Sequence, residues 1–200
     1  MSDLADEIAF AVSALRRGDI VAYPTETFYG LGVDAFDELA LARLRHLKGR
    51  DEKAISVLVD SIEMLERVCL PPPPRARELM RRHWPGALTL VLPAREDIPA
   101  ALVSEGCIAV RHSSHPTAQA LVSGLGNPLT TTSANRAGEP PATTPDAVDQ
   151  IFAGRCRVLY AGTTPGGAPS TLVRIRGEKL EILRRGAIDI DLETPPRDKG

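Results

Sequence analysis

Hydroxyl, amide and basic side chains recur in this sequence at the ends of short apolar runs. In open α/β sheets, ligands bind in the crevice that forms where strand ends meet. Hydroxyls, an amide and arginines together favour a ligand that carries phosphates and carboxylates. The side chains in question are Thr25 and Thr27 after 20–23, Arg111 after 107–110, Ser133 and Asn135 in 127–135, Ser170 before 171–175, and Arg184 after 180–183.

Other kinds of chemistry find little support. A phosphate-binding P-loop needs Gly-Lys-Ser/Thr, and the glycines after Thr27 lack it. No convincing Ser-His-Asp or Cys-His set appears. His112 and His115 are spaced like a metal pair, but no third ligand is near them in sequence, so no metal site is expected. For Glu26, a structural hydrogen bond is favoured over a role as general base.

Each polar position also has a simpler explanation, which the sequence leaves open. Threonines satisfy the backbone of turns, and serine or asparagine caps helices. A basic helix end is favoured by the helix dipole, and single arginines make surface ion pairs. Turn backbone would account for Thr25 and Thr27, and a helix cap for Ser133 and Asn135. The helix dipole would account for Lys48 and Arg50, and surface ion pairs for Arg111 and Arg184.

The composition is that of a globular protein. The chain has 200 residues, with 24 basic and 26 acidic side chains and a formal charge of −2, so no global field for nucleic acid is expected. The three cysteines are far apart, which favours a reducing compartment over a disulfide framework. We expect one domain over 1–188 and a disordered tail over 189–200. Neither a signal peptide nor a membrane span is expected, so the predicted location is the cytoplasm.

Hydrophobic periodicity predicts a mixed α/β sheet flanked by helices. Gly18 and Gly124 are expected to end helices, and Ser61 and Thr144 to begin them. The four prolines 71–74 are read as a stiff loop. Expected helices are 4–17, 38–47, 75–83, 116–124 and 145–152, and expected strands are 19–23, 54–60, 87–93, 107–111, a short one within 127–135, 157–160, 170–175 and 180–184.

Seven segments, in order, resemble the YrdC/TsaC family of threonylcarbamoyl-adenylate synthases. They are YPTETFYGLG, LKGR, HWPGALTLVL, CIAVRHSSHP, TTTSANRAGEPPATT, PSTLV and ILRRGAI, from about Gly18 to Ile188. The resemblance implies a twisted, open α/β sheet around a concave, positively charged cavity. It also implies a reaction that joins L-threonine, bicarbonate and ATP into threonylcarbamoyl-AMP and pyrophosphate. Mg²⁺ would accompany ATP, and downstream proteins would use the product to modify adenosine 37 of tRNA.

The resemblance also implies roles for individual residues. Lys48 and Arg50 would be the catalytic, phosphate-facing pair. L-threonine would contact Thr27, Arg111, Ser133 and Ser170. The nucleotide would contact Cys107, Asn135, Thr143 and Arg184 in addition to Lys48 and Arg50. The glycines after Thr27 would let the chain turn tightly beside the threonine pocket.

The sequence departs from the family pattern after Arg50, where Asp51, Ala54 and Val59 replace a proline, an asparagine and a histidine. Two other functions are therefore kept open. One is a module that binds tRNA or double-stranded RNA without catalysis, to which the basic cluster from Arg75 to His83 would contribute. The other is a carbamoyl-transfer domain like those of larger hydrogenase-maturation proteins.

Overall fold

The computed structural model describes residues 4–49, 53–176 and 179–190. Within these ranges the strands form one mixed sheet in the order β10-β9-β4-β6-β3-β7-β2-β1-β8, with β5 paired to β6. The pairs β1–β8, β3–β6 and β4–β9 are parallel and the remaining pairs are antiparallel. The strands are β1 (Val21–Pro24), β2 (Tyr29–Gly32), β3 (Ser56–Leu58), β4 (Leu88–Pro93), β5 (Val103–Ser104), β6 (Cys107–Arg111), β7 (Leu129–Ser133), β8 (Arg157–Val158), β9 (Thr171–Arg176) and β10 (Lys179–Arg184).

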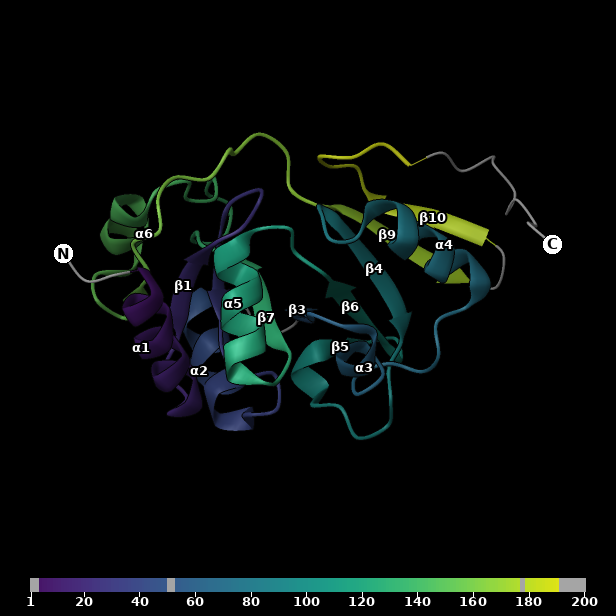
Figure 1. Ribbon diagram of the computed structural model, residues 1–200, viewed down its shortest axis with the longest axis horizontal. Coiled ribbons are helices and arrows are strands. Elements are labelled where there is room, and N and C mark those ends of the chain that lie inside the picture. The colour runs from purple at the N-terminus through teal and green to yellow at the C-terminus, as the bar shows by residue number, and fades with distance from the viewer. Residues whose placement is uncertain (1–3, 50–52, 177–178, 191–200) are drawn as a thin grey trace.

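Helices cover the two halves of the sheet unequally. In Figure 1, α1, α2, α5 and α6 gather around the half that holds β1, β2 and β7, whereas α3 and α4 lie by the half that holds β4, β9 and β10. The predicted mixed α/β fold is thereby confirmed. The helices are α1 (Leu4–Arg16), α2 (Glu38–Lys48), α3 (Ile62–Leu65), α4 (Pro74–His83), α5 (Pro116–Leu125) and α6 (Pro145–Phe152), with a 3-10 turn, η1 (Ala100–Leu102).

Local capping explains where several helices begin. The Ser61 hydroxyl accepts a hydrogen bond from the Met64 amide at 3.1 Å, and the Thr144 hydroxyl accepts one from the Ala147 amide at 3.2 Å. Both predicted caps are confirmed, because each hydroxyl satisfies an amide that has no partner inside its helix. Pro74 is the first residue of α4 rather than part of the proline loop, since its missing N–H costs nothing there.

Two predictions about glycines are wrong. Gly124 lies inside α5, where a Cβ would meet Val12 of α1 at 2.9 Å, and α5 ends instead at Gly126, whose φ is 75°. Gly30 and Gly32 form no tight turn, because both lie within strand β2. A Cβ on Gly32 would lie 2.7 Å from the ring of Tyr23, so the small residue permits close packing inside the sheet.

The predicted boundaries need small adjustments. The expected strand over 54–60 is ordered as a strand only at Ser56–Leu58, and β2, β5 and η1 were not predicted. Ile190, two residues beyond the predicted domain boundary, is buried in the core, while 191–200 lie outside the described residues. In the described part of the chain, every helix is too short or too polar to cross a bilayer.

Candidate active site

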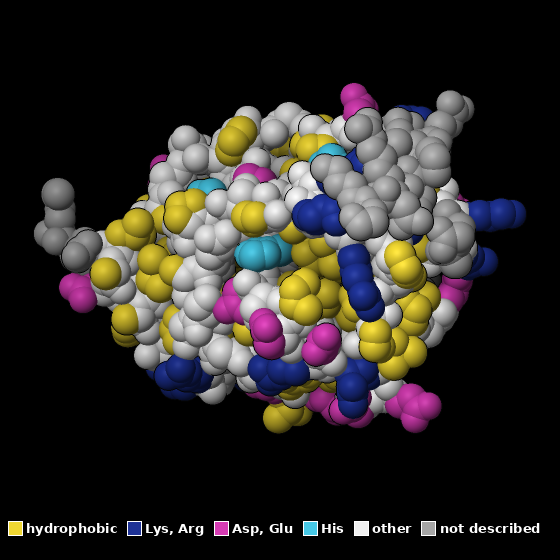
Figure 2. Space-filling model, turned by 45° about the vertical axis from the view of Figure 1, so that its right-hand side comes forward, with side chains coloured by type: hydrophobic (Ala, Val, Ile, Leu, Met, Phe, Trp, Pro, Cys, Tyr) yellow, Lys and Arg dark blue, Asp and Glu magenta, His cyan; other side chains and the backbone are white. Residues whose placement is uncertain are grey.

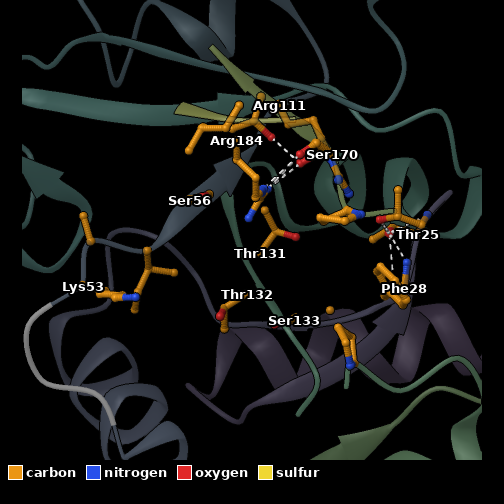
Figure 3. Close-up of a pocket in the computed structure, with 18 of the residues that line it drawn as sticks. Thr25, Phe28, Lys53, Ser56, Arg111, Thr131, Thr132, Ser133, Ser170 and Arg184 are labelled. Carbon is orange, nitrogen blue, oxygen red and sulfur yellow. Dashed lines mark hydrogen bonds between the residues drawn. The ribbon is translucent and has the colours of Figure 1, made fainter. Parts of the chain in front are cut away.

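A cavity of about 610 Å³ opens on the sheet and gathers side chains from distant parts of the chain. Figure 3 shows Arg111, Ser170 and Arg184 together on one side, Thr25 and Phe28 on another, and the β7 residues Thr131–Ser133 between them and Lys53. Of the residues implied by the family resemblance, six line this cavity: Thr27, Lys48, Arg111, Ser133, Ser170 and Arg184. Strand ends far apart in sequence do therefore converge.

Backbone register places a row of four side chains along one wall. Arg184 of β10 pairs with Leu172 of β9, which pairs with Thr89 of β4, which in turn pairs with Arg111 of β6. Directly paired residues on adjacent strands project to the same face, and all four line the cavity. A β-bulge between Ile182 and Arg184 shifts the register of β10, as bulges beside binding sites commonly do.

Arg184 and Ser170 are tied together at one end of this row. The Arg184 Nη2 donates to the Ser170 carbonyl at 2.9 Å and to the Ser170 hydroxyl at 3.1 Å, and its Nε donates to the same carbonyl at 3.2 Å. The Ser170 and Thr89 hydroxyls lie 2.8 Å apart. Burial, and next the positive charge of Arg111, lower the pKa of Arg184. The two arginines therefore repel each other across a site that an anion would stabilise.

Arg111 forms an ion pair with Glu26, which is not part of the described cavity lining. The Arg111 Nε lies 3.6 Å from the Glu26 Oε1, which is an ion pair but longer than a hydrogen bond. The other carboxylate oxygen of Glu26 accepts from the Ser113 hydroxyl. Glu26 thus joins the turn after β1 to the loop after β6, as expected of a structural carboxylate.

The turn between β1 and β2 is stabilised by Thr25. Its hydroxyl donates to the Phe28 carbonyl at 2.7 Å and accepts from the amides of Thr27 and Phe28 at 3.2 and 3.3 Å. The simpler explanation, a threonine that satisfies turn backbone, therefore describes Thr25. The Thr27 carbonyl accepts from the Gly166 amide at 2.8 Å, which seats the 166–167 loop on the same turn.

Lys48, the last residue of α2, is buried and reaches the loop after β7. Its ammonium donates to the Ser133 and Asn135 carbonyls, both at 2.6 Å, and to the Asn135 Oδ1 at 2.8 Å. The Asn135 Oδ1 also accepts from the Ser133 hydroxyl at 2.7 Å. An ammonium has three N–H groups, and three oxygens of this loop lie within hydrogen-bond distance of it. Lys48 therefore orders the loop and brings its positive charge to the cavity wall.

The described lining of the cavity is rich in cations. It contains no carboxylate and five basic side chains, namely Arg45, Lys48, Lys53, Arg111 and Arg184. Lysine supplies a point charge for phosphate, and arginine a planar fork for carboxylate or phosphate. An arrangement of this kind can bind an anion and position it beside hydroxyl donors.

Four of the implied site residues are not part of this described lining. Arg50 lies outside the described residues, so its role stays a prediction. Asn135 stands one layer behind the wall, where it holds Lys48 and Ser133. Cys107 is at the far end of β6, paired with Pro93. Thr143 accepts the Thr164 amide at 2.9 Å through its carbonyl. The nucleotide contacts of these last three stay predictions.

Other lining residues were not singled out from the sequence. Thr89, Thr132, Ser56 and Lys53 belong to this group. The sequence signal for Thr89 is a lone hydroxyl inside the apolar strand 87–93. That signal does not say which face the hydroxyl occupies or what lies opposite, because both depend on the pairing of β4 with β6 and β9.

The basic cluster over Arg75–His83 is divided by the fold. Arg75 is buried and paired with Glu78 at 2.9 Å, and Arg82 also pairs with Glu78. Arg77 and Arg81 remain exposed on α4. One carboxylate therefore pairs with two of the five basic residues and offsets one positive charge, which weakens the cluster as a surface for nucleic acid.

The two histidines after β6 have structural surroundings. The His115 Nδ1 accepts the Thr117 amide at 3.2 Å and caps α5, and the His112 ring lies edge-on to Trp84. Burial lowers the pKa of both histidines. Over the described ranges, no three His, Cys, Asp or Glu side chains are grouped as a metal site.

Comparison with known proteins shows the family to which this chain belongs. A family model named Sua5_yciO_yrdC, with the description telomere recombination, matches residues 13–186. A threonylcarbamoyl-AMP synthase of Chromohalobacter salexigens is 40% identical over 188 residues, which cover 92% of this chain and 100% of that protein. One of Bacillus subtilis is 37% identical over 186 residues, or 91% of this chain and 54% of that protein.

A solved structure agrees with these relatives. The crystal structure of Pyrococcus abyssi Sua5 complexed with L-threonine superposes with a TM-score of 0.87 at 34% identity, covering 93% of this chain and 55% of that one. The chain thus spans about half the length of the Bacillus and Pyrococcus proteins and the full length of the Chromohalobacter protein.

Proposed function

The chain belongs to the Sua5/YciO/YrdC family, and from that premise we propose that it is a threonylcarbamoyl-AMP synthase. The proposed reaction joins L-threonine, bicarbonate and ATP into threonylcarbamoyl-AMP and pyrophosphate, a nucleotidyl transfer. The observation that carries the proposal is the convergence of six residues named by the resemblance on one cavity whose described lining is cationic.

The proposed chemistry needs no protein nucleophile. The amine of threonine captures CO2 or bicarbonate as a carbamate, and a carbamate oxygen then attacks the α-phosphorus of ATP while pyrophosphate leaves. The carbamate, ATP and pyrophosphate are all anionic, so catalysis rests on positioning and on charge stabilisation. The absence of a convincing nucleophile–base set in the sequence is consistent with such a reaction.

We assign the amino acid to the end of the cavity where Arg111 and Ser170 lie. A fork of guanidinium N–H groups fits a carboxylate, and the ion pair with Glu26 restrains Arg111 from behind. Arg184 stands at the opposite end of the same row of side chains from Arg111 and would contact the nucleotide. Thr27 and Ser133 would approach the same substrate from the β1–β2 turn and from β7.

We assign the phosphates to the end where Lys48 and Arg45 lie. Lys48 already donates to three loop oxygens, so it would act on phosphate mainly through its charge. Arg50, two residues on, would supply donors in this proposal. Because the described lining lacks carboxylates, Mg²⁺ would enter as part of the ATP substrate, held by phosphates and water.

The wider assignments also stay proposals. The product would pass to proteins that modify adenosine 37 of tRNA, and the proposed location is the cytoplasm. Weak binding of tRNA or double-stranded RNA would accompany such a role. A module that only binds RNA is less favoured, because Glu78 neutralises part of the α4 cluster and the formal charge of the chain is −2.

The test is pyrophosphate release from ATP by the purified protein with Mg²⁺ and bicarbonate, with and without L-threonine. We expect release that requires both threonine and bicarbonate. Ser133→Ala should raise the threonine concentration needed for half-maximal release. No release from folded protein that binds ATP would refute the proposal, and tight RNA binding at physiological salt would then favour the RNA-binding module.

A further inference from the structure

Thr89 is a buried hydroxyl in the wall of the cavity to which neither the family resemblance nor the proposed mechanism gives a role. Only 3% of the residue is exposed, and it occupies β4 between Arg111 of β6 and Leu172 of β9. Its flanking residues Leu88 and Leu90 point to the other face and are fully buried in the core. Valine has a similar shape and would avoid the cost of burying a hydroxyl, so the presence of a hydroxyl here points to a role for it.

The hydrogen bonds of this region define what the Thr89 hydroxyl can do. It lies 2.8 Å from the Ser170 hydroxyl, and either oxygen can donate to the other. The Ser170 hydroxyl also accepts from the Arg184 Nη2 at 3.1 Å. A guanidinium is only a donor, so Arg184 occupies a lone pair of Ser170 and leaves the serine hydrogen available.

The Thr89 and Ser170 hydroxyls together leave one hydrogen free to donate to a ligand. The two hydroxyls carry two hydrogens, and one of them is used between Thr89 and Ser170. One hydrogen is left over, on whichever hydroxyl accepts from the other. The pair therefore presents a single O–H donor, next to two guanidinium groups, and a carboxylate placed there would accept it.

We propose that Thr89 is a positioning residue for the amino-acid substrate. By donating to Ser170, Thr89 turns the serine hydrogen toward the substrate carboxylate, which Arg111 holds from the adjacent strand. Arg184 restrains the same serine through its carbonyl and hydroxyl. The inference rests on the proposed function, because it takes the substrate at this end of the cavity to be L-threonine.

The experiment compares Thr89→Val, which keeps the shape and removes the hydroxyl, with Thr89→Ser, which keeps the hydroxyl. L-threonine binding is measured by calorimetry without ATP, and ATP binding is measured separately. Loss of one oriented hydrogen bond to a carboxylate should weaken threonine binding by about tenfold in Thr89→Val. Thr89→Ser should stay within about twofold of the wild type, and ATP binding should not change in either variant.

Steady-state kinetics supply the readout that a purely structural role would not give. We expect Thr89→Val to raise the KM for threonine by a similar factor and to leave kcat nearly unchanged, since the hydroxyl does not touch the reacting phosphorus. Thr117→Val is the matched control, because Thr117 is a buried threonine on α5 outside the cavity lining. Thr89→Ala serves in place of Thr89→Val if the valine variant does not fold.

The outcomes separate the two proposals. Wild-type protein that binds no threonine would overturn the proposed function and this inference together. Wild-type protein that binds threonine, with equal binding by Thr89→Val, would overturn the inference alone. Equal losses in Thr89→Ser and Thr89→Val would also overturn it, because the methyl group and its packing would then be what matters.

Discussion

Replacement of Lys48 by methionine should destabilise the protein measurably, because Lys48 joins α2 to the loop after β7. Methionine has a similar length and reach, but it cannot donate to the three oxygens that Lys48 now contacts at 2.6, 2.6 and 2.8 Å. The Asn135 Oδ1 would keep the hydrogen bond from the Ser133 hydroxyl. The Ser133 carbonyl would keep the Asn135 amide as a donor at 3.0 Å, so the Asn135 carbonyl is the acceptor that loses its donor.

The size of the effect follows from the Asn135 carbonyl. A buried acceptor left without a donor costs about 1–3 kcal/mol. The lower end applies here, because the cavity admits water and methionine avoids the desolvation of a charge. The loss in the free energy of unfolding is then about 1 kcal/mol. For a chain of this size, such a loss lowers Tm by about 2–4 °C.

The assay is thermal unfolding by calorimetry, with Lys53→Met as the matched control. Lys53 lines the same cavity and loses the same charge on mutation, but it is exposed. Its substitution should change stability by less than about 0.5 kcal/mol. If the two variants melt within about 1 °C of each other, the contacts of Lys48 with the loop do not stabilise the fold.

Three further perturbations test other parts of the structure. Burial lowers the pKa of His115 in the folded protein, so below about pH 6.5 the unfolded chain binds more protons and stability should fall. His115→Asn keeps an acceptor for the α5 cap and should flatten the dependence of Tm on pH between 7.5 and 5. Burial raises the pKa of the Cys69 and Cys156 thiols to about 12, so both should react with a disulfide reagent at pH 8 far more slowly in native protein than in urea, and equal rates would contradict that burial. Gly32→Ala should lower stability by about 1–3 kcal/mol in urea unfolding, since its Cβ would lie 2.7 Å from the Tyr23 ring, and an unchanged midpoint would show that β1 and β2 pack more loosely than described.

Much of the local structure could be predicted from the sequence, because it depends on neighbouring residues. The caps at Ser61 and Thr144 are formed within three residues, and helical periodicity identified α1, α2 and α5 nearly to their ends. Polar residues at the ends of apolar runs predicted a binding site at strand ends, and the order of the motifs predicted the family. These signals can be read from the sequence because each depends on residues within a short stretch of the chain.

The tertiary structure alone decided which polar residues meet and what each one does. Thr25 and Thr27 look equivalent in the sequence, yet the Thr25 hydroxyl satisfies the turn backbone. Gly30 resembled a turn residue, but the pairing of β2 with β1 and β7 places it inside the sheet.

The reach of Lys48 to Asn135 and the meeting of Thr89 with Ser170 each span more than 80 positions of chain. Such contacts depend on strand order and register, which are set by the burial of whole faces of the sheet rather than by any local pattern.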